Sequence, residues 1–433
     1  MEDKTKGKVD SVLESLFNKY GKYLIYFLPF FLLTGPFLPD LSISLLGIIF
    51  IYLSLTRDLN KYYKNYFTIL FFLFYLYLLV ASFFSLDPSL SFKSIIFYFR
   101  FIFLVLIVWY FIDVDRSFIK NFGYFLIAAF LFALFDGYYQ YLYDESIFGY
   151  TSKLTRLTLP FNDDLLLGSY ISRLFPLLFG LIIFSHFNSK YFLLISFLFL
   201  VLCDVLVFLS GERTALGILI IATVFVVIFI EKYRKIRIFS FLFSLTIISI
   251  IAIYSPEIKT RNIDYTITQL GLENNNTQFQ EEGKLFNKVY LFSEQHHSII
   301  NTAFNIFQDN LLLGSGPNSF RVLCDKDEYS FDEQSCSTHP HNNFVQILSE
   351  LGLVGLIFYL MLCIILFFYF FRFKIDVKKS NLDGPGRNFK ICLFACFLIT
   401  IFPFLPSQNL FHNWINIIYY LPIGFYLGIM QTR

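Results

Sequence analysis

Long apolar runs separated by short polar connections extend over most of the chain. A bilayer core of about 30 Å needs around 20 apolar residues in helical conformation, so each run is a candidate membrane span. Twelve runs fit, at residues 23–38, 41–55, 66–84, 95–112, 118–135, 165–187, 191–209, 216–230, 238–254, 351–371, 391–405 and 414–430. The pattern predicts an all-α polytopic membrane protein with about twelve transmembrane helices. The first two runs are short and are joined by Gly35-Pro36 and Pro39-Asp40, so they can also form a re-entrant pair.

The composition excludes an ordinary soluble protein. Of the 433 residues, 56% are hydrophobic and 15% are charged, whereas a soluble domain is about half apolar and about a quarter charged. The 60 Phe and 29 Tyr are spread through every apolar run, which favours lipid-facing and interfacial positions over sugar-stacking platforms. Residues 1–22 are polar and an apolar run follows at once, so we expect a retained first helix and no cleavable signal peptide.

The distribution of basic residues predicts how the spans are oriented, because Lys and Arg are in excess in cytoplasmic connections. Every second connection is basic, with Arg57, Lys61, Lys64, Arg116, Lys120, Lys190, Lys232, Arg234, Lys235, Arg237, Arg372, Lys374, Lys378, Lys379, Arg387 and Lys390. We therefore predict a cytoplasmic segment at 1–22, helices 1–9 at 23–254, and a large extracytoplasmic loop with short helices at 255–343. Helices 10–12 and a cytoplasmic C-terminus follow at 344–433.

Polar residues gather in two short connections on the predicted outer side. In the first, Arg156 precedes a helix, Asp163 and Asp164 are expected in its first turn, and Arg173 lies about two turns further on. A charge at that depth usually faces a cavity or a partner, so Arg173 either contributes to a site or pairs with one of the aspartates.

The second connection is the tight turn Ser210-Gly211-Glu212-Arg213-Thr214. An arginine that sets orientation would lie on the cytoplasmic side. The position of Arg213 on the outer side therefore favours a bound anion over a simple interfacial anchor.

The large loop holds a third group of polar residues. An amphipathic stretch follows Ser293, and the Gly-rich turn 313–321 lacks the strand and lysine of a nucleotide loop. His341 lies just before a predicted helix, where free N–H groups favour an anion such as phosphate. An imidazole can take a proton from a hydroxyl near neutral pH, and arginine supplies paired donors for phosphate. The pattern indicates group transfer from a diphosphate donor to a hydroxyl, with a structural helix cap as the alternative role of His341.

The six cysteines fall into two groups. Four lie in apolar runs and are interpreted as small hydrophobic residues, namely Cys203, Cys363, Cys392 and Cys396. Cys324 and Cys336 share the large loop and can form a disulfide if that loop faces an oxidising compartment. No Cys and His spacing indicates a metal site.

Several motifs in order resemble the O-antigen ligase family, whose members transfer polymeric glycan from undecaprenyl diphosphate to lipid A–core. The similarity covers roughly 156–360, and its signature is His341-Asn342 followed, after nine intervening residues, by Gly352-Leu353-Val354-Gly355. The motifs that precede the signature are, in order, Arg156, Gly168-Ser169-Tyr170, Ser210-Gly211-Glu212-Arg213-Thr214-Ala215, Asp309-Asn310, Gly314-Ser315-Gly316, Phe320-Arg321 and Cys336-Ser337-Thr338-His339-Pro340. This resemblance implies a bacterial inner-membrane protein with a periplasmic site and neither metal nor cofactor. No nucleic-acid partner is expected.

The resemblance also implies roles for single residues. His341 would be the base that activates the acceptor hydroxyl, and the donor diphosphate would lie near Arg213, with Arg156, Arg173 and Arg321 as further candidates. The family often has an arginine before the amphipathic loop helix, where this chain has Glu294-Gln295-His296-His297. Arg261, Arg321 or His297 can replace it, and Asn342 and Glu212 are expected to support the site. Gly352 and Gly355, three apart on one helix, would permit close helix packing that places His341.

Other activities remain open. A polymerase would use the same donor with a lipid-linked glycan as acceptor, and another class of the superfamily attaches glycan to protein. One large late loop is more typical of ligases. A transporter or glycan flippase is a further alternative, although few charges lie in mid-span, with Asp136, Arg100 and Asp204 as the main exceptions.

Overall fold

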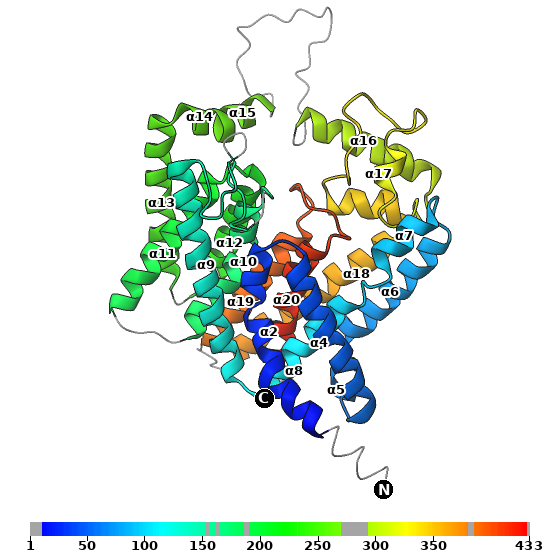
Figure 1. The fold of residues 1–433 in the computed structure, drawn as a ribbon, viewed down its shortest axis with the longest axis horizontal. Coiled ribbons are helices and arrows are strands. Elements are labelled where there is room, and N and C mark those ends of the chain that lie inside the picture. Colours follow the sequence, from blue (N-terminus) through cyan, green and yellow to red (C-terminus); the bar gives the residue numbers. More distant parts are fainter. Residues whose placement is uncertain are drawn as a thin grey trace, which may run out of the picture.

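The computed structural model describes residues 11–152, 156–161, 164–185, 190–231, 233–269, 293–379 and 385–430. These residues are predominantly helical, and they contain no strand beyond an isolated bridge between Glu145 and Thr151. The predicted all-α membrane class is therefore confirmed (Figure 1).

The helices have the following bounds: η1 Phe17–Gly21, α2 Lys22–Tyr26, α3 Leu28–Leu33, α4 Phe37–Thr56, α5 Asn60–Tyr63, α6 Tyr66–Phe83, α7 Pro88–Ile95, α8 Arg100–Val114, α9 Ser117–Tyr143, α10 Leu167–Phe184, α11 Lys190–Leu209, α12 Arg213–Phe229, α13 Arg234–Tyr254, α14 Pro256–Lys259, η2 Thr260–Asp264, α15 Tyr265–Gln269, α16 Glu294–Asp309, α17 Phe320–Leu323, α18 Asn343–Lys379, α19 Pro385–Ile401 and α20 Asn413–Met430. Within the described ranges, eight helical segments are long and apolar enough to cross a membrane, and α12 is a shorter apolar helix. The number twelve stays a prediction.

The boundary between the first two predicted spans is wrong. Helix α4 begins at Phe37, so Pro39 and Asp40 lie inside its first turn instead of separating two helices. Proline is tolerated there because its missing N–H group would have no partner within the helix. The break lies earlier, at Gly35, whose positive φ of 96° turns the chain.

Three helices form the centre of the bundle. Every residue from Arg100 to Ile112 in α8 is buried, as is every residue from Leu167 to Ile183 in α10. Helix α20 packs against α8, where a Cβ at Gly424 would lie only 2.7 Å from the side chain of Val108. Small residues at such crossings let helices approach closely in a membrane. The outer helices α4, α6, α13 and α18 instead expose many large apolar side chains, as lipid-facing helices do.

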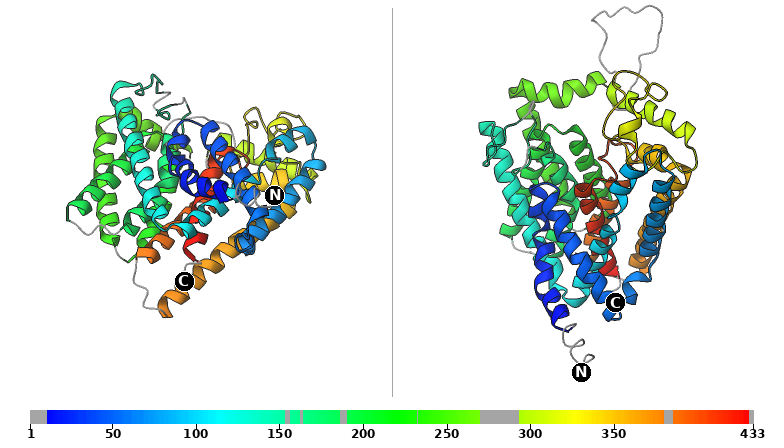
Figure 2. Two further views of the ribbon diagram at one scale, coloured as in Figure 1. Left: turned by 60° about the horizontal axis from the view of Figure 1, so that its bottom comes forward. Right: turned by 45° about the vertical axis from the view of Figure 1, so that its right-hand side comes forward.

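The two ends of the bundle differ. One end carries residues 255–269 and 293–342, here called the loop end, with α14 and α15 on one side and α16 and α17 on the other (Figures 1 and 2). At the opposite end, ion pairs join the connections between helices, including Arg57 to Glu14 at 2.9 Å and Lys61 to Asp113 at 2.8 Å. The functional candidates of the sequence lie mainly at the loop end.

Candidate functional site

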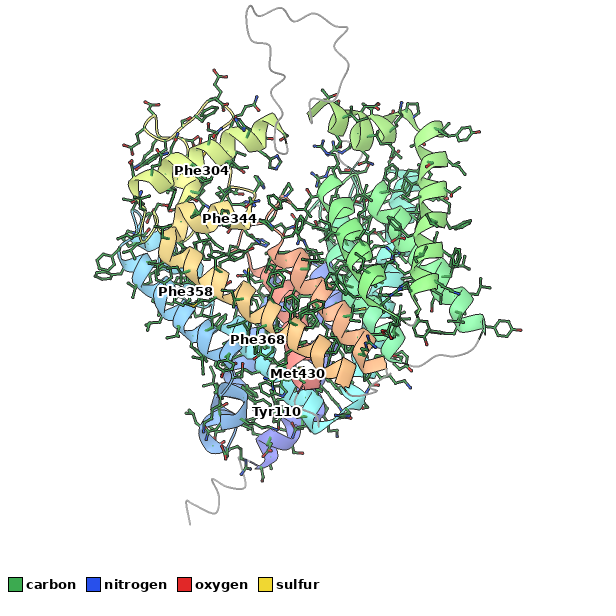
Figure 3. The ribbon with its side chains drawn as sticks, turned by 180° about the vertical axis from the view of Figure 1, so that it is seen from behind. Tyr110, Phe304, Phe344, Phe358, Phe368 and Met430 are labelled. Carbon is green, nitrogen blue, oxygen red and sulfur yellow. A yellow bond between two sulfur atoms is a disulfide. The ribbon has the colours of Figure 1, made fainter. Side chains whose placement is uncertain are left out.

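Helix α16 lies on the beginning of α18 and brings two distant parts of the loop end together. The apolar face of α16, with Ile299, Ala303 and Ile306, packs in one cluster with Phe320 and Val345. Figure 3 shows Phe304 of α16 above Phe344 at the start of α18, with Phe358 and Phe368 further along α18. The predicted amphipathic helix is thus present, and its first turn lies beside the residues that precede α18.

His341 lies in this place, two residues before α18, with a positive φ of 54°. Its Nε2 is 2.9 Å from the hydroxyl of Ser337, and its backbone carbonyl accepts a 2.7 Å hydrogen bond from the N–H of Ser407. Two other imidazoles are close, since the ring centroids of His339 and His296 lie 4.1 Å and 5.4 Å from that of His341. Three histidines therefore share one site at the loop end.

The environment keeps these histidines neutral. Burial lowers the pKa of His296 to about 4, and the nearby His341 and the charge of Arg213 contribute to this shift. Burial and the nearby His341 lower the pKa of His339 to about 3. Burial also lowers the pKa of His341 itself. A neutral imidazole at pH 7 can accept a proton, so His341 is in the protonation state that a general base requires.

The turn before α12 is held by a buried carboxylate. Glu212 accepts hydrogen bonds from the backbone N–H groups of Gly168 (2.7 Å) and Ser169 (3.2 Å) and from the Ser169 hydroxyl (2.7 Å). These donors belong to the first turn of α10, where a helix favours negative charge. A Cβ at Gly168 would lie 2.2 Å from the Ser210 hydroxyl, so only glycine permits this approach. Glu212 thereby fixes the position of Arg213, the first residue of α12.

Three arginines converge beside this turn, and we call Arg156, Arg213 and Arg261 the arginine cluster. Burial lowers the pKa of Arg261, and the positive charges of Arg156 and Arg213 lower it further, which places all three within electrostatic range. Arg156 donates to the carbonyl of Leu165 at 3.0 Å, and Arg261 donates to that of Gly211 at 3.3 Å. Among the described residues, the buried Nε of Arg156 has no hydrogen-bond partner. Such a group of cations is suited to an anion with several oxygens.

The structure places the other predicted residues elsewhere. Helix α10 begins at Leu167, so Asp164 precedes it, and Asp163 lies outside the described residues. Arg173 is 4% exposed and its guanidinium lies 5.6 Å from the ring centroid of Tyr419 in α20. Its guanidinium thus contacts α20, and its buried Nε has no hydrogen-bond partner among the described residues.

His297 and Arg321 also lie apart from the arginine cluster. The ring of His297 lies 6.0 Å from that of Phe331, whereas the neighbouring His296 faces His341. Arg321 follows the first residue of α17, and its charge acts on His339 and His412. Of the replacements considered for the missing loop arginine, Arg261 is the one that lies with Arg156 and Arg213.

The expectation that Gly352 and Gly355 lie on one continuous helix is wrong. Helix α18 breaks at Gly352, where φ is 62° and ψ is −161°. The Gly-rich turn packs into the break and is hydrogen-bonded to the helix on both sides of it. Before the break, the helix carbonyls of Ser349 and Glu350 accept from Ser315 N (3.0 Å) and Gly316 N (2.9 Å). After the break, Leu353 N and Val354 N donate to the carbonyls of Leu311 (2.9 Å) and Leu312 (3.2 Å). A Cβ at Gly352 would lie 2.4 Å from the Leu312 carbonyl oxygen, so the glycine permits a loop to approach the helix. The nearest atom to a Cβ at Gly355 would be Cβ of Leu351 in the same helix, at 2.3 Å.

Comparison with known proteins agrees with these motifs. A family model described as O-antigen ligase matches residues 195–360. The resemblance to the O-antigen ligase family is confirmed. A protein of Rickettsia conorii with the provisional name polysaccharide ligase is 38% identical over 76 residues, which is 18% of this chain. The match spans 16% of that relative's length. The family segment contains Arg213, Arg261, His296, His341 and the break in α18, whereas Arg156 precedes it.

The sequence reading missed the connection between α19 and α20, which supports the family motif around His341. Asn342 caps α18 by accepting from the N–H of Val345 at 3.1 Å, and its amide donates to the carbonyl of Pro403 at 2.8 Å. Nε2 of His339 lies 3.1 Å from the carbonyl oxygen of Ser407, whose N–H binds the His341 carbonyl. Two prolines and the polar run Ser407-Gln408-Asn409 in an apolar region were the available signal.

A disulfide joins Cys324 and Cys336, which are 12 residues apart, and the segment that leads to His341 begins just after it. Among the described residues, Cys324, Asp325 and Cys336 form a grouping with metal-ligand spacing. Its two sulfurs are already bonded to each other, so this grouping lacks the free thiolates that a metal would need.

Proposed function

We propose that this protein is an O-antigen ligase-type glycosyltransferase that moves a glycan from an undecaprenyl-diphosphate donor to a hydroxyl of lipid A–core. The reaction would take place at the periplasmic face of the bacterial inner membrane, where the loop end would lie. The single observation that carries the proposal is the neutral His341, in a group of histidines that lies within electrostatic range of Arg213. This combination provides a base for a hydroxyl and cations for a diphosphate at one place.

The arginine cluster would bind the donor diphosphate. Arginine binds phosphate oxygens through paired donors, and these hydrogen bonds are roughly twice as strong as those between neutral groups. Arg156 is held beside Arg213 and Arg261 by its hydrogen bond to the carbonyl of Leu165. We do not include Arg173 and Arg321 in the proposed donor site, because the guanidinium of Arg173 lies over the ring of Tyr419 and the charge of Arg321 acts on His339 and His412.

The transfer would use His341 as base. His341 takes the proton of the acceptor hydroxyl, whose oxygen attacks the anomeric carbon of the donor glycan. The bond between that carbon and the diphosphate oxygen breaks, and undecaprenyl diphosphate leaves with the electron pair. The arginine cluster stabilises the negative charge that develops on the leaving group. Glu294-Gln295-His296-His297 stands where the family often has an arginine, and Arg261 would supply that cation in this chain.

The test is transfer by the purified protein with undecaprenyl-diphosphate glycan, offered either lipid A–core or a second lipid-linked glycan. The proposal predicts glycan on lipid A–core. Growth of the lipid-linked chain without transfer to lipid A–core would make the protein a polymerase. Lipid-linked glycan crossing a liposome bilayer without any transfer would instead establish a flippase.

A pair of matched variants tests the donor site in the same assay. Arg261→Gln removes one cation of the cluster, and we expect the KM for the donor to rise about tenfold, the effect of losing one charge-assisted hydrogen bond. Arg387→Gln removes an arginine that pairs with Glu231 at the opposite end of the bundle and should leave this KM unchanged. Equal donor KM values for the two variants would contradict the assignment.

A further inference from the structure

A positively charged cavity lies at the loop end, lined by residues other than those of the arginine cluster. Its volume is about 400 Å³, and the polar groups that line it include Lys93, Arg100, Asn318, Arg321, Asn409 and His412. The cavity is formed by α7, the start of α8, α17 and the connection before α20. The Asn318 amide holds two of these parts together by donating to the Ser94 hydroxyl and accepting from the Asn409 amide, both at 2.9 Å. We call this space the cationic cavity.

The charges of the cationic cavity favour an anion. Asp40 is the one carboxylate among its lining residues, and it pairs with Arg100 at 2.6 Å. Lys93 and Arg321 lie at the surface of the cavity and remain as positive charges that Asp40 does not offset. Glu350 and Asp164 lie within electrostatic range of Arg321 and His412, but neither lines the cavity. The lining itself carries Lys93, Arg100 and Arg321 against Asp40, and this excess of positive charge attracts phosphate or carboxylate groups.

The position of His341 relates this space to the reaction. His341 lies between two other imidazoles, of which His296 is influenced by Arg213 of the arginine cluster and His339 by Arg321 of the cationic cavity. The cationic cavity therefore lies near the group of histidines that contains the candidate base.

We propose that the cationic cavity binds the anionic group of the acceptor glycolipid. This inference rests on the proposed function and adds to it a binding site for the acceptor. The recognised chemistry is a phosphate or carboxylate carried by an amphiphile. Lys93 and Arg321 would be specificity residues for that group.

The first test compares two acceptors in the transfer assay, lipid A–core with its phosphates and the same molecule after enzymatic dephosphorylation. For the wild-type protein we expect a KM about tenfold higher for the dephosphorylated acceptor, the loss of about one charge-assisted contact. The double variant Lys93→Gln, Arg321→Gln should raise the KM for the phosphorylated acceptor and remove the difference between the two acceptors. Both side chains are exposed, so the fold should survive. Arg261→Gln is the matched control, which should raise the donor KM and keep the difference.

The second test measures binding without turnover, so it stays informative if no transfer occurs. Diphosphoryl lipid A is added to the protein in nanodiscs, and bound lipid is counted by native mass spectrometry for the wild type and the double variant, with phosphatidylglycerol as the comparison lipid. We expect the wild type to bind lipid A in preference to phosphatidylglycerol and the double variant to lose that preference. Equal lipid A binding by both proteins would overturn the proposal. Equal binding of the two lipids would assign the cavity to bulk anionic phospholipid and would also overturn it.

Discussion

The break in α18 gives a sharp test of the structure, through the substitution Gly352→Ala. Gly352 has φ 62° and ψ −161°, a region that only glycine adopts readily, and a side chain there costs of order 1–3 kcal/mol. The new Cβ would lie 2.4 Å from the Leu312 carbonyl oxygen and 2.6 Å from the Gly314 nitrogen. The turn must therefore move away, which breaks the hydrogen bonds of Leu353 and Val354 at about 1 kcal/mol each. We expect a total loss of stability of about 3–5 kcal/mol.

The assay is thermal unfolding in detergent, followed by intrinsic fluorescence, with the transfer assay on the same preparations. A matched control is Gly386→Ala, because a Cβ at Gly386 meets nothing within 4 Å and alanine favours a helix by up to about 1 kcal/mol. Gly352→Ala should unfold at a clearly lower temperature and transfer less glycan, while Gly386→Ala should match the wild type in both. If the Gly352→Ala protein were as stable and active as the control, the proposed docking of the Gly-rich turn in the helix break would be refuted.

Two further predictions concern the loop end. Replacing Cys324 and Cys336 by serine removes a disulfide between residues that are 12 apart in the sequence. This should cost about 3 kcal/mol of local stability, so limited proteolysis should cut the loop of the variant faster than that of the wild type. Equal rates of cutting would contradict a stabilising disulfide. His339 has a folded-state pKa of about 3, below its ordinary value. Its contribution to the stability of the protein is therefore present above about pH 6.5 and is lost as the pH falls towards the folded-state pKa. The loss is about 1.4 kcal/mol per pH unit. The melting temperature should therefore drop between pH 7 and pH 5, and His339→Asn should reduce this slope, whereas an unchanged slope would contradict the assignment.

The sequence was informative where a single local pattern decides the outcome. Apolar runs longer than a bilayer needs indicated the membrane helices, because no soluble fold can bury so much apolar surface. Arg213 and His341 were found as charged or titratable residues in short polar connections between apolar runs. In the structure these two residues come from different parts of the chain, and both lie within electrostatic range of His296 in α16. The order of their motifs, and not any one of them, indicated the family.

The parts that could not be predicted depend on contacts between distant residues. A glycine in an apolar run has the same local pattern whether it permits helix packing or a helix break, and the turn that fills the break lies about 40 residues earlier. The connection at 402–412 is more than 60 residues from the histidines that it supports. The sequence does contain a local signal for which of His296 and His297 faces the site. His296 lies three residues before the buried Ile299 and therefore shares its helix face.

The central claim is that His341 acts as the base of a transfer whose donor the arginine cluster binds. The most direct measurement is the turnover of His341→Ala, with donor binding measured separately and His297→Ala as the control, because His297 lies against Phe331. We expect His341→Ala to bind the donor like the wild type and to lose about 10²–10⁴-fold in kcat, the usual contribution of a general base, while His297→Ala remains near wild type. Turnover of His341→Ala close to that of the wild type, with glycan still arriving on lipid A–core, would contradict it.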